Sequence, residues 1–147
     1  MEPQRKKHKR NHPASDIEGG LIMKKMTKIE IITRPEKLES LKEGMNKIGV
    51  TGMTVTQVLG YGLQKGHREV YRGTEYNVNL VPKVKVEIVV CEVPVEKVIE
   101  TAKTICRTGN VGDGKIFVYG IDNAVRIRTG EEGDKAIIDP ADIHINS

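Results

Sequence analysis

Apolar and polar residues alternate in several parts of the chain with the period of a β-strand. In residues 28–34, Ile29 and Ile31 fall on one face and Glu30, Ile32 and Arg34 on the other, as expected for a strand. A second segment, residues 53–61, is rich in β-branched side chains. A third, residues 83–90, alternates strictly, which indicates a strand with one face packed against helices. The pattern predicts strands over residues 28–34, 53–61, 83–90 and 116–121, and a short fifth strand over 124–128.

Two amphipathic helices are predicted between these strands. Each begins at a proline, Pro35 or Pro94, which the first position of a helix tolerates. Each ends near a glycine, Gly49 or Gly109, where a left-handed residue is favoured. Apolar residues recur at helical spacing; they are Leu38, Leu41, Met45 and Ile48 in the first helix and Val95, Val98, Ile99, Ala102, Ile105 and Cys106 in the second.

The order strand, helix, strand, strand, helix, strand predicts an α+β fold of the ferredoxin-like type, an antiparallel sheet with both helices on one face. The other face would then be uncovered. An open face of mixed apolar and charged character favours self-association, and the alternative is a sheet simply solvated on one side. By alternation this face carries Ile32, Lys85, Glu87, Val89, Cys91, Phe117 and Tyr119.

Composition agrees with one small domain. The 147 residues are 37% hydrophobic and 3% aromatic, with no Trp and one Phe, so the core is expected to be aliphatic. No apolar stretch is long enough to cross a bilayer and no signal peptide is evident, which favours a cytoplasmic protein. Cys91 and Cys106 are expected to be small buried residues.

The net charge of +4 is concentrated at the start of the chain. Residues 1–25 contain seven basic and three acidic residues, which leaves 17 of each in the remainder. The cluster from Arg5 to Arg10 has the charge to bind phosphate backbones, but so polar a segment is more typical of a disordered tail. We therefore expect a basic tail over 1–25, a domain over 26–137 and a C-terminal extension over 138–147.

The segment from Gly62 to Val81 has no helical or strand periodicity. Compact domains rarely contain so long a loop without a use. It is rich in glycine and in polar residues suited to recognition, and Tyr71 and Tyr76 are two of only five aromatic residues in the chain. The sequence predicts a mobile recognition loop, and a functionless insertion is the alternative.

A glycine-rich segment, residues 108–115, ends with Gly-Asp-Gly-Lys. Its backbone can present amide hydrogens to an anion, and Lys115 adds a charge, although a plain tight turn remains open. Arg126 and Arg128 are two apart on the predicted short strand, so they would share a face while Val125 and Ile127 point inward. Lys115, Arg126 and Arg128 are therefore candidates to neutralise a polyphosphate. A solvated edge strand is the alternative.

The sequence contains none of the signatures of an enzyme. There is no nucleophile elbow, no His pair at metal-binding spacing and no Walker loop. The four histidines are His8, His12, His67 and His144, in the predicted tail, loop and C-terminal end. We predict that the protein is not an enzyme.

Three stretches resemble the PII family of nitrogen-regulatory signal-transduction proteins. They are Gly52–Thr56 with Gly62–Gly66, Tyr71–Tyr76, and Thr108–Ile121 followed by Arg126–Glu132. The resemblance covers about residues 26–137. It implies a homotrimer of ferredoxin-like subunits that binds ATP or ADP in clefts between subunits.

The resemblance also implies roles for individual residues. Ile32, Thr54, Gly60 and Val89 would border the adenosine. Gln64 would coordinate Mg²⁺ beside ATP, and Lys83 would pair with a carboxylate of 2-oxoglutarate. The phosphates would be held by Gly112, Asp113, Gly114 and Lys115, with Arg126 and Arg128 reaching in from the neighbouring subunit.

In the family, the shape of the long loop decides which partner docks. The resemblance implies that Arg72 contacts partners such as an ammonium channel or nitrogen-assimilation enzymes and regulators, and that Tyr76 matches a uridylylated tyrosine. Leu63 departs from the family pattern, which leaves the preference between ATP and ADP open, and Thr74 departs from it within the modification motif. The alternatives are a nucleic-acid-binding module that uses the basic tail, or a slow ATPase.

Overall fold

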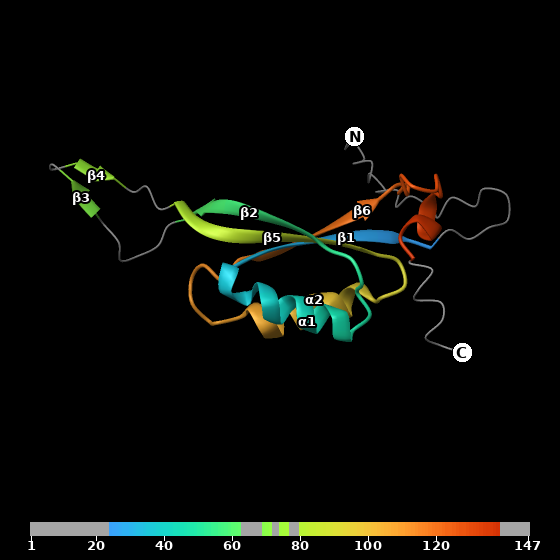
Figure 1. Cartoon of the computed structure of the whole chain (residues 1–147). Coiled ribbons are helices and arrows are strands. Elements are labelled where there is room, and N and C mark those ends of the chain that lie inside the picture. The colour runs from blue at the N-terminus through green and yellow to red at the C-terminus, as the bar shows by residue number, and fades with distance from the viewer. Residues whose placement is uncertain (1–23, 63–68, 72–73, 77–79, 139–147) are drawn as a thin grey trace, which may run out of the picture.

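The computed structural model describes residues 24–62, 69–71, 74–76 and 80–138. Its main element is a four-stranded sheet with the strand order β2-β5-β1-β6, shown in Figure 1. Every neighbouring pair in this sheet is antiparallel. The strands are β1 (Met26–Thr33), β2 (Thr54–Tyr61), β5 (Leu80–Val90) and β6 (Lys115–Ile121).

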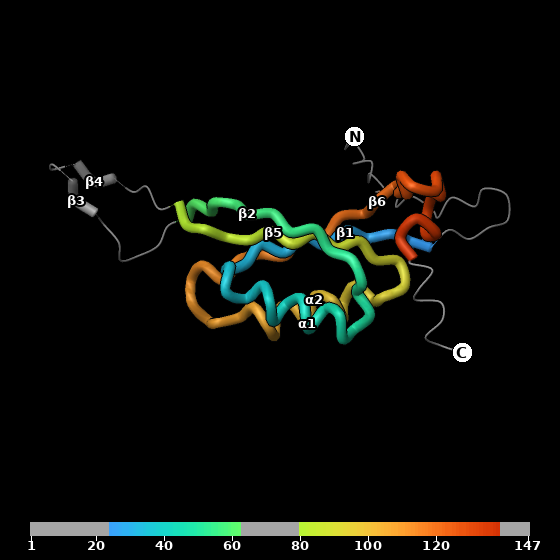
Figure 2. Tube along the Cα trace, in the orientation of Figure 1, coloured from blue at the N-terminus to red at the C-terminus, as the bar shows by residue number. Residues whose placement is uncertain are grey.

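Two helices cover one face of this sheet and lie side by side, as the trace in Figure 2 also shows. They are α1 (Leu38–Lys47), which follows the 3₁₀ turn η1 (Pro35–Lys37), and α2 (Val95–Cys106). Both start beside the predicted prolines and both are followed by a glycine with positive φ, 96° at Gly49 and 87° at Gly109. The predicted ferredoxin-like architecture is confirmed.

The core lies between the sheet and the helices and is aliphatic, as the composition predicts. Alternate residues of the central strands are fully buried beneath the helices, which agrees with the predicted strand faces. Cys106 belongs to the core, but Cys91 is only half-buried, so the prediction of burial holds for one cysteine and not for the other. The buried cluster is Ile29, Ile31, Leu41, Met45, Val50, Val86, Ile88, Val90, Val98, Ala102 and Cys106.

The long connection between β2 and β5 contains two short strands, which the sequence did not predict. Its described residues form β3 (Glu69–Tyr71) and β4 (Thr74–Tyr76), which pair antiparallel as a separate two-stranded sheet. Strands of three residues are too short to produce a recognisable alternation of apolar and polar positions. Residues 63–68, 72–73 and 77–79 of this connection lie outside the described part.

The predicted fifth strand over 124–128 is also wrong. Within the part of the chain that the structure describes, its only ladder contact is an isolated bridge between Val125 and Glu132. The chain turns back on itself at Gly130, where φ is 74°. The turn satisfies its own backbone, because the Arg126 N–H donates to the Glu131 carbonyl at 2.8 Å. Val125 and Ile127, expected to point inward, are 56% and 99% exposed.

A second 3₁₀ turn, η2 (Gly133–Ala136), follows this bend. The predicted basic tail and C-terminal extension lie outside the described residues, apart from residues 24–25 and 138. Across the described ranges, no helix combines the length and the apolar character needed to cross a membrane.

Candidate functional site

The glycine-rich segment forms a closed loop between α2 and β6. At its end, Gly114 has a φ of +107°, and a Cβ there would lie 1.7 Å from the Ile32 carbonyl oxygen. Only glycine combines this φ with so close an approach to another backbone. Gly114 therefore lets the loop sit directly on the end of β1.

The Asp113 carboxylate holds the loop closed. Its oxygens accept hydrogen bonds from the Thr108 N–H at 2.8 Å and the Gly109 N–H at 2.9 Å, and from the Thr108 hydroxyl. The Arg34 Nε also donates to Asp113 Oδ1, at 3.3 Å. These donors, the Thr108 hydroxyl foremost, hold the pKa of Asp113 far below its usual range, since they favour the charged form.

Three successive loop carbonyls point toward the body of the domain. The Val111 carbonyl accepts from Arg34 Nη2 at 3.0 Å, the Gly112 carbonyl from Lys83 Nζ, and the Asp113 carbonyl from the Thr33 hydroxyl at 3.4 Å. These donors come from the adjacent strands β1 and β5 and from the residue after β1. The peptide planes between residues 111 and 114 are therefore fixed from one side.

This arrangement decides where the loop amides point. In a trans peptide the carbonyl of one residue and the N–H of the next lie on opposite sides of the chain. With the three carbonyls turned inward, the N–H groups of Gly112, Asp113 and Gly114 are turned outward. No hydrogen bond among the described residues uses these three N–H groups. Gly112 and Gly114 both have positive φ, a backbone conformation that anion-binding nests use.

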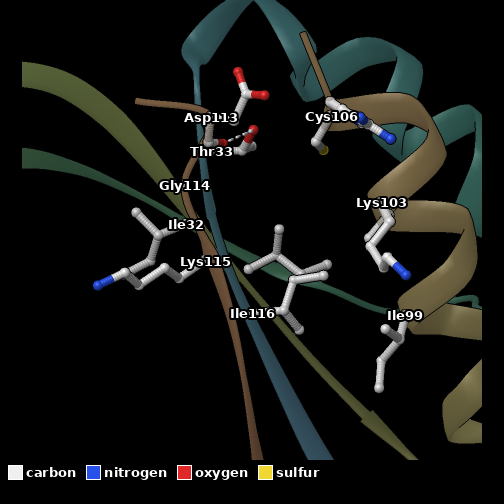
Figure 3. A pocket seen from close by; sticks show the side chains of 12 residues that line it. Ile32, Thr33, Ile99, Lys103, Cys106, Asp113, Gly114, Lys115 and Ile116 are labelled. Atoms are coloured by element: carbon white, nitrogen blue, oxygen red, sulfur yellow. Dashed lines mark hydrogen bonds between the residues drawn. The ribbon is translucent and has the colours of Figure 1, made fainter. Parts of the chain in front are cut away.

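Two lysines flank this nest in different states. Lys83 is 8% exposed, and burial, followed by the nearby Arg34 charge, lowers its pKa. Lys115 is exposed and pairs with Ile32 across β1 and β6. Figure 3 shows Ile32 and Lys115 side by side on the face away from α2, while Ile116 turns toward Ile99. The Lys115 charge therefore stands on the open face, at the end of the nest.

An open pocket of ≈ 500 Å³ borders the same loop on the helix side. Its walls come from α2, β1 and β6, with Ile99, Ala102 and Ile116 among the apolar residues and Lys103 at the rim. The pocket and the nest share Asp113 and Gly114. Nothing in the sequence predicted this pocket, because it depends on how α2 lies beneath the edge strand.

The structure brings together only some of the residues predicted to border the adenosine. Ile32 pairs with Lys115, and Gly60 lies so close to Lys83 that a Cβ added at this glycine would be 3.2 Å from the lysine Cγ. Thr54 is six residues from Gly60 along β2, about 20 Å away at the rise of a strand. Val89 is equally far from Lys83 along β5. A single chain therefore does not gather all of these residues at one place.

The two predicted arginines lie at the opposite end of β6 from the nest. Lys115 opens this seven-residue strand, which is roughly 20 Å long. Arg126 and Arg128 come after its far end, in the segment that Figure 1 places at the opposite end of β6 from the loop after α2. Arg126 donates to the Ala136 carbonyl at 3.4 Å and to the Ile138 carbonyl at 2.7 Å, and Arg128 is exposed. The structure thus does not join Lys115 with these arginines within one chain.

Two of the predicted residues, Gln64 and Arg72, lie outside the described part of the chain. Tyr76 is the last residue of β4, where only the backbone is described. Sequence reasoning also missed Arg34, Thr33 and Thr108, which support the nest. The one signal available was that Arg34 follows a strand and precedes Pro35, a position that ends an element.

Comparisons with known proteins agree with this architecture. The family model for "Nitrogen regulatory protein P-II" matches residues 26–131. The chain belongs to the P-II family. A nitrogen regulatory protein P-II from Pasteurella multocida is 54% identical to this P-II protein over 112 residues, 76% of the chain and 100% of the relative. P-II 1 from Escherichia coli is 52% identical over the same shares.

Solved structures of relatives show the same fold as this P-II protein. Bacillus subtilis GlnK is 54% identical, with a TM-score of 0.65 over 76% of this chain and 98% of that one. A complex of B. subtilis GlnK with ATP gives a TM-score of 0.66 at the same identity, over 76% and 97%. The resemblance inferred from the three sequence stretches is thereby confirmed.

Asp113 is expected to make the stability of this P-II protein fall in acid. Its pKa is lowered in the folded chain, so its contribution is complete above the pKa of an unfolded Asp, about 3.9, and decreases as the pH falls below that value toward the folded pKa. Urea unfolding of the wild type and of Asp113→Asn should therefore give a constant difference between about pH 5 and pH 7 that shrinks near about pH 3. A difference that stays unchanged throughout the acid range would contradict this assignment.

Proposed function

We propose that this protein senses adenine nucleotide together with 2-oxoglutarate and controls nitrogen-related target proteins by contact. The observation that carries the proposal is the nest, in which the amides of Gly112, Asp113 and Gly114 point outward and Lys115 stands at their end. Amide hydrogens and an adjacent ammonium group suit the β- and γ-phosphates of ATP. Asp113 contributes its N–H to the phosphates, and its carboxylate closes the loop.

The proposed cleft lies between two copies of the chain. The adenosine would be bordered by Ile32 and Gly60 from one copy and by Thr54 and Val89 from the next, because these pairs are far apart within one chain. Arg126 and Arg128 would come from the neighbouring copy for the same reason. Arg126 bonds to the Ala136 and Ile138 carbonyls through Nε and Nη2. A guanidinium group has five N–H donors, and those that make no bond to the described residues would bind phosphate.

The edges of the sheet support a closed ring of such copies. β2 and β6 are the two edge strands, and both expose apolar side chains, among them Leu59 and Tyr61 on β2 and Phe117 and Val118 on β6. Exposed apolar edges favour association. Two different surfaces that meet head to tail close into a ring when the rotation between successive copies closes, and we propose the homotrimer of the family.

Lys83 is proposed to bind a carboxylate of 2-oxoglutarate. Its ammonium group lies under the nest, and its lowered pKa reflects an environment in which an added carboxylate would be favourable. Mg²⁺ would bind together with the ATP phosphates and would need few protein ligands. The proposed protein ligand is the amide oxygen of Gln64. No cluster of three metal-ligating side chains occurs in the described ranges, which fits a metal held mainly by its nucleotide.

The response is proposed to pass through the connection between β2 and β5. Gln64 belongs to this connection and Lys83 follows it in β5. Ligand occupancy at these two residues would select the shape of the connection, and Arg72 would then contact the partner. The proposed partners are an ammonium channel and enzymes or regulators of nitrogen assimilation. Tyr76, at the end of β4, is the proposed modification site.

Calorimetry tests this proposal directly. ATP with Mg²⁺ is titrated into the full chain with and without 2-oxoglutarate. Each ligand is expected to increase the affinity of the protein for the other, because binding free energies are linked reciprocally. An unchanged ATP affinity would remove Gln64 and Lys83 from their roles. Tight, salt-sensitive binding of single-stranded RNA without nucleotide affinity would instead favour a nucleic-acid-binding module. ADP formed during long incubation would indicate a slow ATPase.

A further inference from the structure

Arg34 connects the end of β1 to two different parts of the nest. It follows β1 in an extended conformation, with φ −66° and ψ 141°, and precedes η1. Its Nη2 donates to the Val111 carbonyl at 3.0 Å and its Nε to Asp113 Oδ1 at 3.3 Å. Its side chain is 22% exposed. One planar group thus holds both a backbone carbonyl and the carboxylate that closes the loop.

We propose that Arg34 is the positioning residue of the phosphate nest. Its bond to the Val111 carbonyl turns the Gly112 N–H outward, because the two groups belong to one trans peptide. Its bond to Asp113 fixes the carboxylate that gathers the N–H groups of Thr108 and Gly109. Arg34 acts through these backbone groups and its donors are directed at the loop, so it is not itself a phosphate ligand here.

A lysine at this position would reproduce only part of the effect. The guanidinium offers donors in a fixed fork, which spans the carbonyl and the carboxylate at once, whereas an ammonium group is a single point charge on a flexible chain. The remaining two carbonyls of the nest would still be held by Lys83 and Thr33. Removal of Arg34 should therefore loosen the first amide of the nest while the domain stays folded.

This inference rests on the proposed function, and its test separates the two. Arg34→Gln, Arg34→Lys and the control Lys37→Gln are compared. Lys37 lies three residues away and its loss removes the same charge, but among the described residues its side chain makes no hydrogen bond to the loop carbonyls. Binding of ATP, of adenosine and of tripolyphosphate is measured for each folded variant. The amide resonances of Gly112 and Gly114 are followed during the tripolyphosphate titration.

Arg34→Gln is expected to lower the affinity for ATP and for tripolyphosphate by about 10-fold or more. Its affinity for adenosine should fall by less than about 2-fold. Arg34→Lys should recover part of the loss, and Lys37→Gln should bind nearly as the wild type does. Equal losses for ATP and adenosine, or a wild-type response of the Gly112 amide in Arg34→Gln, would overturn the role of Arg34. A wild-type chain that binds neither ATP nor tripolyphosphate would overturn the proposed function itself. If Arg34→Gln does not fold, Arg34→Lys decides, because full wild-type affinity in that variant excludes a need for the fork.

Discussion

Replacing Gly114 with alanine is expected to destabilise the domain more than any other single change in the glycine-rich loop. The new Cβ would lie 1.7 Å from the Ile32 oxygen and 2.7 Å from the Ile32 carbonyl carbon. Both are backbone atoms of β1, which is paired on both sides by β5 and β6, so they cannot move aside cheaply. Overpacking and a positive φ together should cost about 3–5 kcal/mol.

Urea unfolding measures this cost, and Gly109→Ala provides a matched control. Gly109 also has a positive φ, of 87°, but a Cβ there meets nothing within 4 Å. The control should lose only the conformational part, about 1–2 kcal/mol. If the two variants unfold at the same urea concentration, the close contact between the loop and β1 is wrong, and with it the inward orientation of the three carbonyls.

Subunits with complementary defects are expected to restore nucleotide binding only when they are mixed. Lys115→Glu places a negative charge at the end of the nest, and the double variant Arg126→Glu with Arg128→Glu reverses the charges at the far end of β6. Each change alone should remove measurable ATP binding from a homotrimer, because repulsion replaces attraction at the phosphates. A mixed trimer contains one seam where an intact nest meets intact arginines, so one working site should return.

The measurement uses two affinity tags to isolate the mixed trimers, followed by titration with ATP. The separately purified parent variants are the controls, and their thermal unfolding confirms that they remain folded. Binding by the mixture, at one site per trimer, supports a cleft shared between copies. Loss of binding in the mixture as well as in both parents would place the lysine and the arginines in the same chain and contradict the seam. If either parent variant binds ATP as the wild type does, the residues changed in that variant do not belong to the site.

The regular elements were predictable because their signal is local. Alternation in β1 and β5 and the helical spacing of Leu41, Met45, Val98 and Ala102 report burial directly, and the prolines and glycines mark the helix ends. The prediction is wrong where a strand is too short to show alternation, and where the hydrogen bonds of the backbone are made within a turn. This is the case for the three-residue strands β3 and β4, and for residues 124–128, whose alternation of Val125 and Ile127 suggests a strand although the chain forms a turn.

The candidate site shows the same division. Its glycines and Lys115 could be identified from their order in the sequence, since positive φ and a charge after a turn are properties of neighbouring residues. The partners of the loop could not, because Arg34 and Lys83 are 79 and 29 residues away from Asp113 and Gly112. The separation of Lys115 from the two arginines could not be predicted either, because it depends on β6 forming an extended strand between them.

By itself, the sequence determined the fold class, the aliphatic core and the residues from which a phosphate-binding loop is made, because periodicity and backbone preference are encoded in residues close together. Only the tertiary structure decided which way the loop amides face and which candidates can meet within one chain. The physical reason is that peptide orientation is set by donors from β1, from Arg34 just after it and from β5, and such contacts exist only once those strands have paired.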